Sequence, residues 1–217
     1  MSNHDLPRAA GRYCEGEDDA QAKIAMALLL TLRGTPFLYY GEEIGMRDIR
    51  LRRREILDPP GRRYWPFYRG RDGCRAPMQW DGSANAGFSP AGSARPWLPV
   101  HPDHARRNVE SQSTDTGSLL SFTRGLIALR RQAPALVRGD YTLLASPPGT
   151  LVYLRSTPGQ RVLAAMNFAR RKAVVHLDRA GELGRVLLSS RPERPGGTSS
   201  AVELAPGQVL LAELNGS

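Results

Sequence analysis

The stretch from residue 20 to residue 33 constrains the fold of this chain more than any other, because it is apolar on nearly all sides. It reads Ala-Gln-Ala-Lys-Ile-Ala-Met-Ala-Leu-Leu-Leu-Thr-Leu-Arg, and both Ala and Leu are strong helix formers. A helix without a polar face has to be buried on several sides. A β-prone run over residues 35–40 follows directly after Gly34. We therefore predict a helix and then a buried strand, a succession that fits a βα barrel repeat.

Residues 47–112 have a different character. They are rich in Arg, Pro, Gly, Asp and Trp and show little periodicity. An irregular segment of this length inside a compact domain is uncommon unless it is functional. After it, a second helix is predicted over residues 117–132, with Leu119, Leu126 and Leu129 on its apolar side and Pro134 ending it.

The last third of the chain has the pattern of an all-β domain. Short β-prone runs alternate with the turn signals Pro147-Pro148-Gly149, Pro158-Gly159 and Pro206-Gly207. Runs of this length and spacing predict an antiparallel β-sandwich. We expect strands over residues 141–145, 150–155, 161–168, 173–177, 185–188, 202–204 and 208–213, and a loop over residues 189–201.

Three segments in the first half of the chain carry a resemblance. Residues 3–8 read Asn-His-Asp-Leu-Pro-Arg, residues 34–46 read Gly-Thr-Pro-Phe-Leu-Tyr-Tyr-Gly-Glu-Glu-Ile-Gly-Met, and residues 71–81 read Arg-Asp-Gly-Cys-Arg-Ala-Pro-Met-Gln-Trp-Asp. In this order they resemble the α-amylase superfamily of glycoside hydrolases, and within it the α-glucosidases and oligo-1,6-glucosidases. The resemblance covers residues 2 to about 180 and is strongest over residues 2–112.

The resemblance implies a fold and a domain organisation. In that family the Asn-His-Asp lies at the end of the seventh strand of a (β/α)8 barrel, and such a barrel needs roughly 250 residues. The 217 residues here are then expected to form the tail of a barrel, one or two βα units with a long loop, over residues 1–132. A β-sandwich domain over residues 133–217 completes the expected fold, which is α/β and then all-β. The helix at 20–33 and the strand at 35–40 are expected to pack against the rest of the barrel.

The same resemblance assigns roles to four residues. Asp5 matches the carboxylate that stabilises an oxocarbenium-like transition state. His4 matches a residue that binds the hydroxyls of the cleaved glucose. Arg8 matches a basic residue of the same motif and is expected to hold the Asp5 carboxylate in place. Arg75 matches a residue that closes the pocket at the non-reducing end of the substrate, and Ala76 replaces the Thr usual beside it.

Other candidates have plainer interpretations. Glu42 and Glu43 are neighbours in the expected strand and would point to opposite faces, so they cannot flank one bond. We interpret Glu42 as structural. Three loop aromatics, Trp80, Phe88 and Trp97, have the chemistry to stack on sugar rings, but they fit a role as loop anchors better. No Asp or Glu of this chain stands in a motif matching the family's nucleophile or its acid/base Glu, which lie on earlier strands.

The sequence therefore predicts the C-terminal portion of a retaining exo-acting α-glucosidase that is inactive by itself. Two alternatives stay open: a non-catalytic carbohydrate-binding or scaffold remnant, and a fragment of a sucrose isomerase or trehalose synthase. The expected partners are an α-glucosidic oligosaccharide or disaccharide and the N-terminal portion of the barrel. No cofactor and no metal is expected.

Charge and cysteine usage bear on partners and compartment. Thirty basic residues stand against 21 acidic ones, a net charge of +9, but the runs 50–54, 62–63 and 170–172 are not interleaved with aromatics as in RNA-binding proteins. We predict no nucleic-acid partner. Cys14 and Cys74 lack metal-ligand spacing and favour free thiols in a reducing compartment. With no apolar stretch of 18 residues, the predictions are a cytoplasmic location and no membrane partner.

Overall fold

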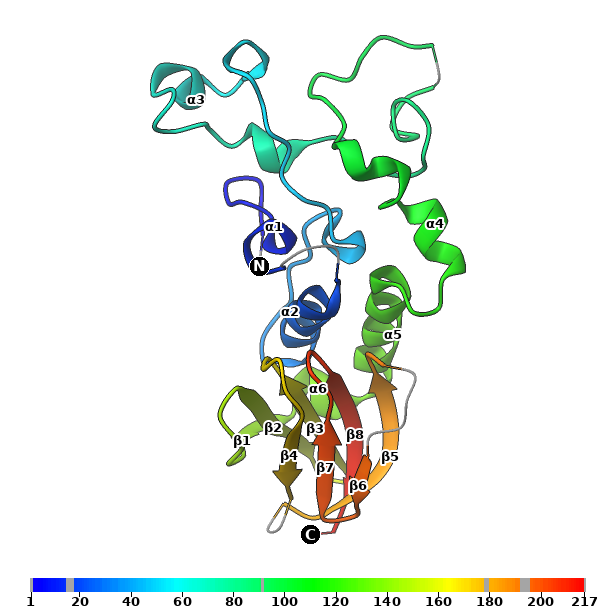
Figure 1. The fold of residues 1–217 in the computed structure, drawn as a ribbon. Helices are drawn as coiled ribbons and strands as arrows, with labels where there is room; N and C mark the ends of the chain where they lie inside the picture. Colours follow the sequence, from blue (N-terminus) through cyan, green and yellow to red (C-terminus); the bar gives the residue numbers. More distant parts are fainter. Residues whose placement is uncertain (1, 15–17, 91, 178–179, 192–195, 217) are drawn as a thin grey trace. The chain divides into compact units, whose positions relative to one another are not determined.

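The computed structural model describes residues 2–14, 18–90, 92–177, 180–191 and 196–216. These residues form two compact units. Unit 1 comprises Met1–Ala22 and Phe37–Ser121, and unit 2 comprises Lys23–Pro36 and Phe122–Ser217. Figure 1 traces the chain through both.

Unit 2 contains two antiparallel sheets. The larger has the strand order β1-β2-β3-β8-β5 and the smaller the order β4-β7-β6. Figure 1 shows the smaller sheet lying across one face of the larger one. The predicted sandwich is thus confirmed. Its strands are β1 (Asp140–Leu143), β2 (Thr150–Thr157), β3 (Gln160–Asn167), β4 (Ala173–His176), β5 (Glu182–Ser189), β6 (Gly196–Thr198), β7 (Ala201–Leu204) and β8 (Val209–Asn215).

Strand β2 illustrates how period-two alternation builds two cores on one sheet. Val152 and Leu154 point to the core between the sheets, which also contains Leu163 from β3 and Val202 from β7. The intervening Tyr153 points to the opposite face and joins a second core. Alternating side chains on a strand face opposite sides of its sheet, so both faces of the larger sheet are apolar and both need a cover.

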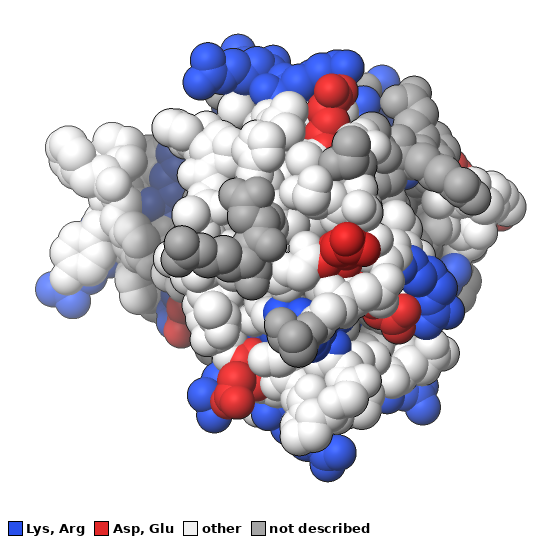
Figure 2. All heavy atoms as spheres, turned by 90° about the horizontal axis from the view of Figure 1, so that it is seen from below, with Lys and Arg blue, Asp and Glu red and all other residues white. Residues whose placement is uncertain are grey.

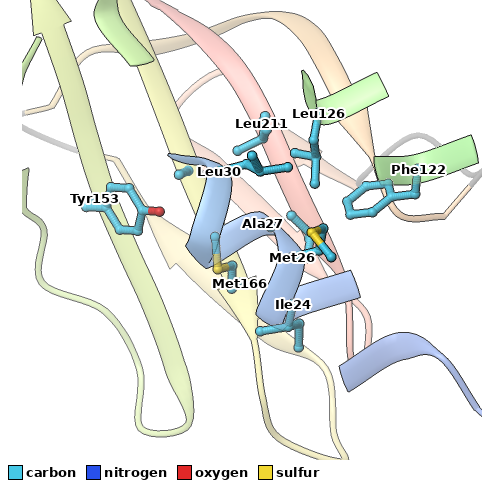
Figure 3. Close-up of a cluster of buried hydrophobic side chains, with 11 residues drawn as sticks. Ile24, Met26, Ala27, Leu30, Phe122, Leu126, Tyr153, Met166 and Leu211 are labelled. Atoms are coloured by element: carbon cyan, nitrogen blue, oxygen red, sulfur yellow. The ribbon is translucent and has the colours of Figure 1, made fainter. Parts of the chain in front are cut away.

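Two helices cover the second face. They are α2 (Ala20–Thr31) and α5 (Leu119–Gln132), which confirm the helices predicted at 20–33 and 117–132. Figure 3 shows Ala27 and Leu30 of α2 and Leu126 of α5 packed together with Leu211 of β8. The full cluster of buried side chains is Ile24, Met26, Ala27, Leu30, Phe122, Leu126, Tyr153, Ala164, Met166, Val209 and Leu211.

The compact units do not coincide with the predicted domains, and the domain boundary stays a prediction. The division at residue 132/133 assigned both helices to the barrel tail, whereas residues 23–36 and 122–132 group with the sheets. The physical reason is that the sandwich has a second apolar face, which the apolar sides of α2 and α5 bury. Amphipathicity indicates that a helix face is buried but not what covers it.

Two arginines bind the C-terminal end of α2. The Nη1 of Arg130 donates to the Leu30 carbonyl at 2.7 Å and its Nη2 donates to the Gly34 carbonyl at 2.8 Å. The fully buried Arg155 donates from Nη1 to the Thr31 carbonyl at 2.5 Å. The last turn of α2 contains no basic residue of its own, so these two side chains satisfy carbonyls that every helix end leaves open.

Unit 1 is built from short helices and loops around a small core. Its complete elements are α1 (Ala9–Tyr13), α3 (Pro59–Arg63) and α4 (Val109–Thr114), with 3-10 turns at Glu42–Ile44, Arg53–Glu55, Asp72–Arg75 and Pro102–Ala105. The core includes Ile44, Met46, Ile56, Met78 and Leu98. The irregular nature of residues 47–112 is confirmed for the most part, although short helical turns interrupt them.

Two local predictions were wrong. Residues 35–40 form no strand, since the described part of unit 1 contains no strand that could pair with them, and a strand needs a neighbour for its backbone hydrogen bonds. Phe37 is accordingly 79% exposed.

Residues 189–201 are not wholly a loop, because β5 ends at Ser189 and β6 pairs with β7 at Gly197↔Val202. Residues 192–195 of that stretch lie outside the described residues.

Candidate functional site

Asp5 sits in a turn that its own neighbour builds. The Oδ1 of Asn3 accepts hydrogen bonds from the backbone N–H of Asp5 at 2.8 Å and of Leu6 at 2.9 Å. An Asn side chain that binds the backbone two and three residues on fixes a local turn. The side chain of Asp5 is 48% exposed. The motif thus orients the carboxylate at the surface of unit 1.

Two guanidinium groups hold the Asp5 carboxylate. The Nη2 of Arg75 lies 3.0 Å from Asp5 Oδ1, and the Nη1 of Arg71 lies 3.1 Å from the same oxygen. Arg75 also donates from Nε to the His4 carbonyl at 2.7 Å, and His4 Nε2 lies 3.4 Å from Asp5 Oδ2. The structure therefore brings together His4, Asp5 and Arg75, three of the four residues that the sequence singled out.

Arg71 is a member of the site that sequence reasoning missed. Besides its bond to Asp5, it donates from Nη2 to Asp58 Oδ1 at 2.7 Å and from Nε to Asp58 Oδ2 at 3.2 Å. The hydrogen bonds from Arg71 hold the pKa of Asp58 below its usual range, and the same pair raises the pKa of Arg71. A forked Arg–carboxylate contact fixes both groups in one orientation. The arginine stands four residues before Arg75, within a motif already recognised, and this spacing was the available signal.

Asp58 is itself held from its other side. The Oδ2 of Asp72 accepts from the backbone N–H of Leu57 at 2.6 Å and of Asp58 at 2.8 Å. Gly70 adopts a φ of +78°, and a Cβ at that position would lie 2.8 Å from Asp58 Oδ2. Glycine at residue 70 therefore allows the backbone before Arg71 to approach Asp58 closely. A chain of contacts runs from the buried Asp72 and Asp58 through Arg71 to the exposed Asp5.

The expected role of Arg8 is corrected. Its guanidinium is fully buried and donates from Nη1 to the Tyr40 carbonyl at 2.7 Å, with the rings of Tyr39 and Tyr40 at 5.0 and 4.7 Å. Among the described residues, Arg71, Arg75 and His4 are the ionic partners of Asp5, and Arg8 is not one of them. Because Arg8 lies in the first turn leading into α1, its side chain points to the 39–40 segment, where cation–π contacts and a carbonyl receive it.

Glu42 has a structural role, as predicted, but not for the predicted reason. It lies in a 3-10 turn and not in a strand. Its Oε1 accepts from the N–H of Ser2 at 2.8 Å and from the Ser2 hydroxyl, and its Oε2 accepts from the N–H of Tyr39 at 3.1 Å. The carboxylate of Glu42 therefore ties the start of the Asn-His-Asp segment to the 39–42 segment.

A pocket of about 420 Å³ adjoins Arg75 within unit 1. The aromatic residues Trp80, Phe88 and Trp97 line it and are 50%, 45% and 58% exposed. Glu43 also lines it, and burial raises the pKa of this carboxyl. These aromatics therefore do not act purely as buried loop anchors.

Other features of the described residues bear on the remaining predictions. Cys14 and Cys74 are both free. No group of three His, Cys, Asp or Glu side chains comes together as a metal-ligand set in the part of the chain that is described. Within that same part, no helix has the length and apolar character needed to cross a bilayer.

On the face drawn in Figure 2, basic side chains lie in separate groups with acidic side chains and uncharged surface between them.

Comparison with known proteins gives one family. Residues 1–139 match the family described as "Alpha amylase, catalytic domain". The probable alpha-glucosidase of Rhizobium meliloti is 38% identical over 179 residues, which cover 82% of this chain and 32% of that protein. The oligo-1,6-glucosidase of Parageobacillus thermoglucosidasius is 36% identical over 200 residues, which cover 82% of this chain and 35% of that protein.

A solved structure agrees with these sequence matches. The trehalulose synthase of Pseudomonas mesoacidophila matches with a TM-score of 0.85 and 30% identity, over 99% of this chain and 42% of that one. The chain spans about a third of the length of the two curated relatives. Because the catalytic-domain family covers well over half of its residues, the chain belongs to the alpha-amylase family.

Proposed function

We propose that this chain is the C-terminal portion of a retaining, exo-acting α-glucosidase that hydrolyses α-glucosidic bonds of oligosaccharides. The observation that carries the proposal is the contact of Arg75 with both Asp5 Oδ1 and the His4 carbonyl. It joins two motifs 70 residues apart around one exposed carboxylate. The names of the two curated relatives support the substrate class.

In this proposal Asp5 stabilises positive charge that develops on the glucosyl ring. The retaining mechanism needs a nucleophile and an acid about 5–5.5 Å apart. Arg71, Arg75 and His4 contact the Asp5 carboxylate, and its role in charge stabilisation follows from the resemblance of the Asn-His-Asp segment to the family's motif. His4 and Arg75 bind sugar hydroxyls beside it. The nucleophile and the acid come from a portion of the enzyme outside this chain, which makes that portion its first partner.

One alternative has a specific observation in its favour. The trehalulose synthase match covers 99% of this chain, so a glucosyl transfer to a sugar acceptor is the second candidate activity. Hydrolysis and isomerisation share the covalent glucosyl intermediate and differ in what attacks it, water or a sugar hydroxyl. The third candidate is a scaffold that catalyses no reaction. The absence of nucleic-acid and membrane partners and the cytoplasmic location stay predictions.

The test uses a chimera in which this chain replaces the matching segment of the Rhizobium meliloti relative. We expect the isolated chain not to hydrolyse p-nitrophenyl α-glucoside, and the chimera to do so with retention of anomeric configuration, followed by NMR. Incubation with sucrose separates the first two candidates, because a hydrolase releases glucose and fructose whereas an isomerase yields a second disaccharide. A folded chimera that turns over neither substrate would contradict both candidate activities and favour the non-catalytic scaffold.

A further inference from the structure

The loop that carries His4 and Asp5 is closed by the hydroxyl of Ser2. Ser2 Oγ accepts a hydrogen bond from the backbone N–H of Ala9 at 2.7 Å, so one side chain joins the two ends of residues 2–9. Both end residues are buried, whereas the side chains of His4 and Asp5 between them are 71% and 48% exposed. The loop is therefore fixed at its base and presents these two side chains at the surface of unit 1.

A single carboxylate holds the base of this loop. Glu42 Oε1 accepts from the backbone N–H of Ser2 at 2.8 Å and from the Ser2 hydroxyl. That hydroxyl thus donates to Glu42 while it accepts from Ala9, which uses its one donor and one of its acceptor sites. Glu42 is buried, and hydrogen bonds to an ionised acceptor are about twice as strong as those between neutral groups. The contact therefore anchors the loop firmly.

The Glu42 carboxylate is oriented by the turn in which it lies. Its Oε2 accepts from the backbone N–H of Tyr39 at 3.1 Å, and the preceding Gly41 adopts a φ of +80°. A Cβ on Gly41 would lie 2.3 Å from the sulfur of Met46, so only glycine allows this close turn. Both oxygens of Glu42 are thus directed by backbone donors, and Ser2 meets a carboxylate that its own turn has fixed.

The placement of Asp5 depends on the anchored end of the loop. Asn3, the residue after Ser2, accepts from the N–H groups of Asp5 and Leu6, so the turn around Asp5 begins one residue beyond the anchor. The carboxylate then lies 3.0 Å from Arg75 Nη2. Because a displacement of about 1 Å in a reacting group can lower a rate by about 10²-fold, the base of the loop determines how well Asp5 can act.

We propose that Ser2 and Glu42 are positioning residues for Asp5, whose carboxylate they hold in place through the closed base of the loop. Neither side chain carries a positive charge that could pair with that carboxylate, so both act through the backbone. The inference rests on the proposed function for the reaction that Asp5 serves. The closure of the loop rests on the hydrogen bonds of Ser2 alone.

The first test follows backbone amide exchange by NMR in the full chain, which requires no catalysis. In Ser2→Ala the Ala9 amide loses its acceptor, and we expect it to exchange about tenfold faster, together with the two amides that Asn3 binds. Ser2→Thr keeps the hydroxyl and should keep the slow exchange. Ser93→Ala is the matched control, because that hydroxyl donates to the Pro90 carbonyl of its own turn. Unchanged exchange in Ser2→Ala would overturn the proposal.

The second test asks whether the closed loop acts through Asp5. In the active chimera, Ser2→Ala and Glu42→Gln should each lower kcat for p-nitrophenyl α-glucoside about tenfold and change KM less. In a chimera that already carries Asp5→Asn, the same changes should lower kcat by less than about twofold, because the effects of groups that act as one unit are not additive. An equal loss in both backgrounds would show a merely structural role and overturn the proposal.

Together the two tests separate this inference from the proposed function. An active chimera in which Ser2→Ala changes neither kcat nor amide exchange overturns the positioning role and keeps the function. A folded but inactive chimera, with an Ala9 amide that responds to Ser2→Ala in the full chain, keeps the closed loop and overturns the function.

Discussion

Arg75 binds Asp5 through its side chain and, at the same time, binds the backbone of the residue before it. Its Nη2 lies 3.0 Å from Asp5 Oδ1 and its Nε lies 2.7 Å from the His4 carbonyl. A forked guanidinium that engages a carboxylate and the adjoining backbone fixes both the position and the direction of that carboxylate. Arg75 therefore acts on the Asn-His-Asp segment before any substrate arrives.

Arg71 is expected to be a positioning residue for Asp5. In the chimera, Arg71→Gln should lower kcat by about 10–100-fold with a smaller change in KM, because misplacement of a charge-stabilising group acts mainly in the transition state. Arg71→Lys should recover only part of the loss, since Lys cannot contact Asp58 and Asp5 as a planar fork. Steady-state kinetics of both variants check this. Arg69→Gln is the matched control, and an equal loss in it would contradict the assignment.

The Arg71–Asp58 pair also predicts a pH dependence of stability. The pKa of Asp58 is lowered in the folded chain, mainly by the hydrogen bond from Arg71. A lowered folded pKa contributes stability above the unfolded value, about 3.9 for Asp, and the contribution disappears as pH falls through the folded pKa. Arg71→Gln should therefore destabilise unit 1 at pH 7 and cost progressively less below about pH 4. Thermal melts from pH 7 to pH 2.5 measure the difference in stability between wild type and variant. A difference that stays constant with pH would contradict a stabilising role of the Arg71–Asp58 pair.

Arg155 should be essential to unit 2. It is fully buried and donates to the carbonyls of Thr31, Leu136, Gly139 and Asp140. Arg155→Met should lower the free energy of unfolding by about 3 kcal/mol or more, since each buried carbonyl left without a donor costs about 1–3 kcal/mol. Urea denaturation gives the value. Arg185→Met is the control and should change little, because its pair with Glu213 is at the surface.

The packing of α2 on the sheet predicts slow hydrogen exchange in that helix. Ile24, Ala27 and Leu30 are buried in the same cluster as Met166 of β3, so amides over residues 24–31 should exchange as slowly as those over residues 162–166. Leu126→Ala should speed both segments together and lower stability by about 2–5 kcal/mol. Fast exchange of residues 24–31 beside a protected β3 would show that α2 does not belong to this unit.

The sequence was informative where local pattern decides the structure. The apolar residues of α2, the short β-prone runs of the last third of the chain and the Pro-Gly turns between them were sufficient to predict their elements. The strand predicted at 35–40 failed because β structure depends on a pairing partner, and propensity does not reveal whether one is present. Strand β6 was missed because Gly196 and Gly197 lack β propensity, and its pairing with β7 overrides that preference.

The candidate site was predictable to the extent that motifs carried it. His4, Asp5 and Arg75 come together as the motifs indicate. Arg8 was misassigned because spacing along the chain does not give side-chain direction, and its guanidinium points to Tyr39 and Tyr40. Asp58 lies 13 residues from Arg71 and belongs to no motif that was recognised. Contacts of this kind depend on the path of an irregular loop, which periodicity does not determine.

We propose that Asp5 stabilises the transition state of glycosidic bond cleavage. The direct measurement is kcat for p-nitrophenyl α-glucoside in the chimera with Asp5→Asn, and with Asp115→Asn as the matched control. We predict a loss of about 10²–10³-fold for Asp5→Asn, as for removal of one preorganised electrostatic group, and wild-type kcat for the control. A folded Asp5→Asn chimera that retains wild-type kcat would contradict the role assigned to Asp5 and, with it, the proposed function of this chain.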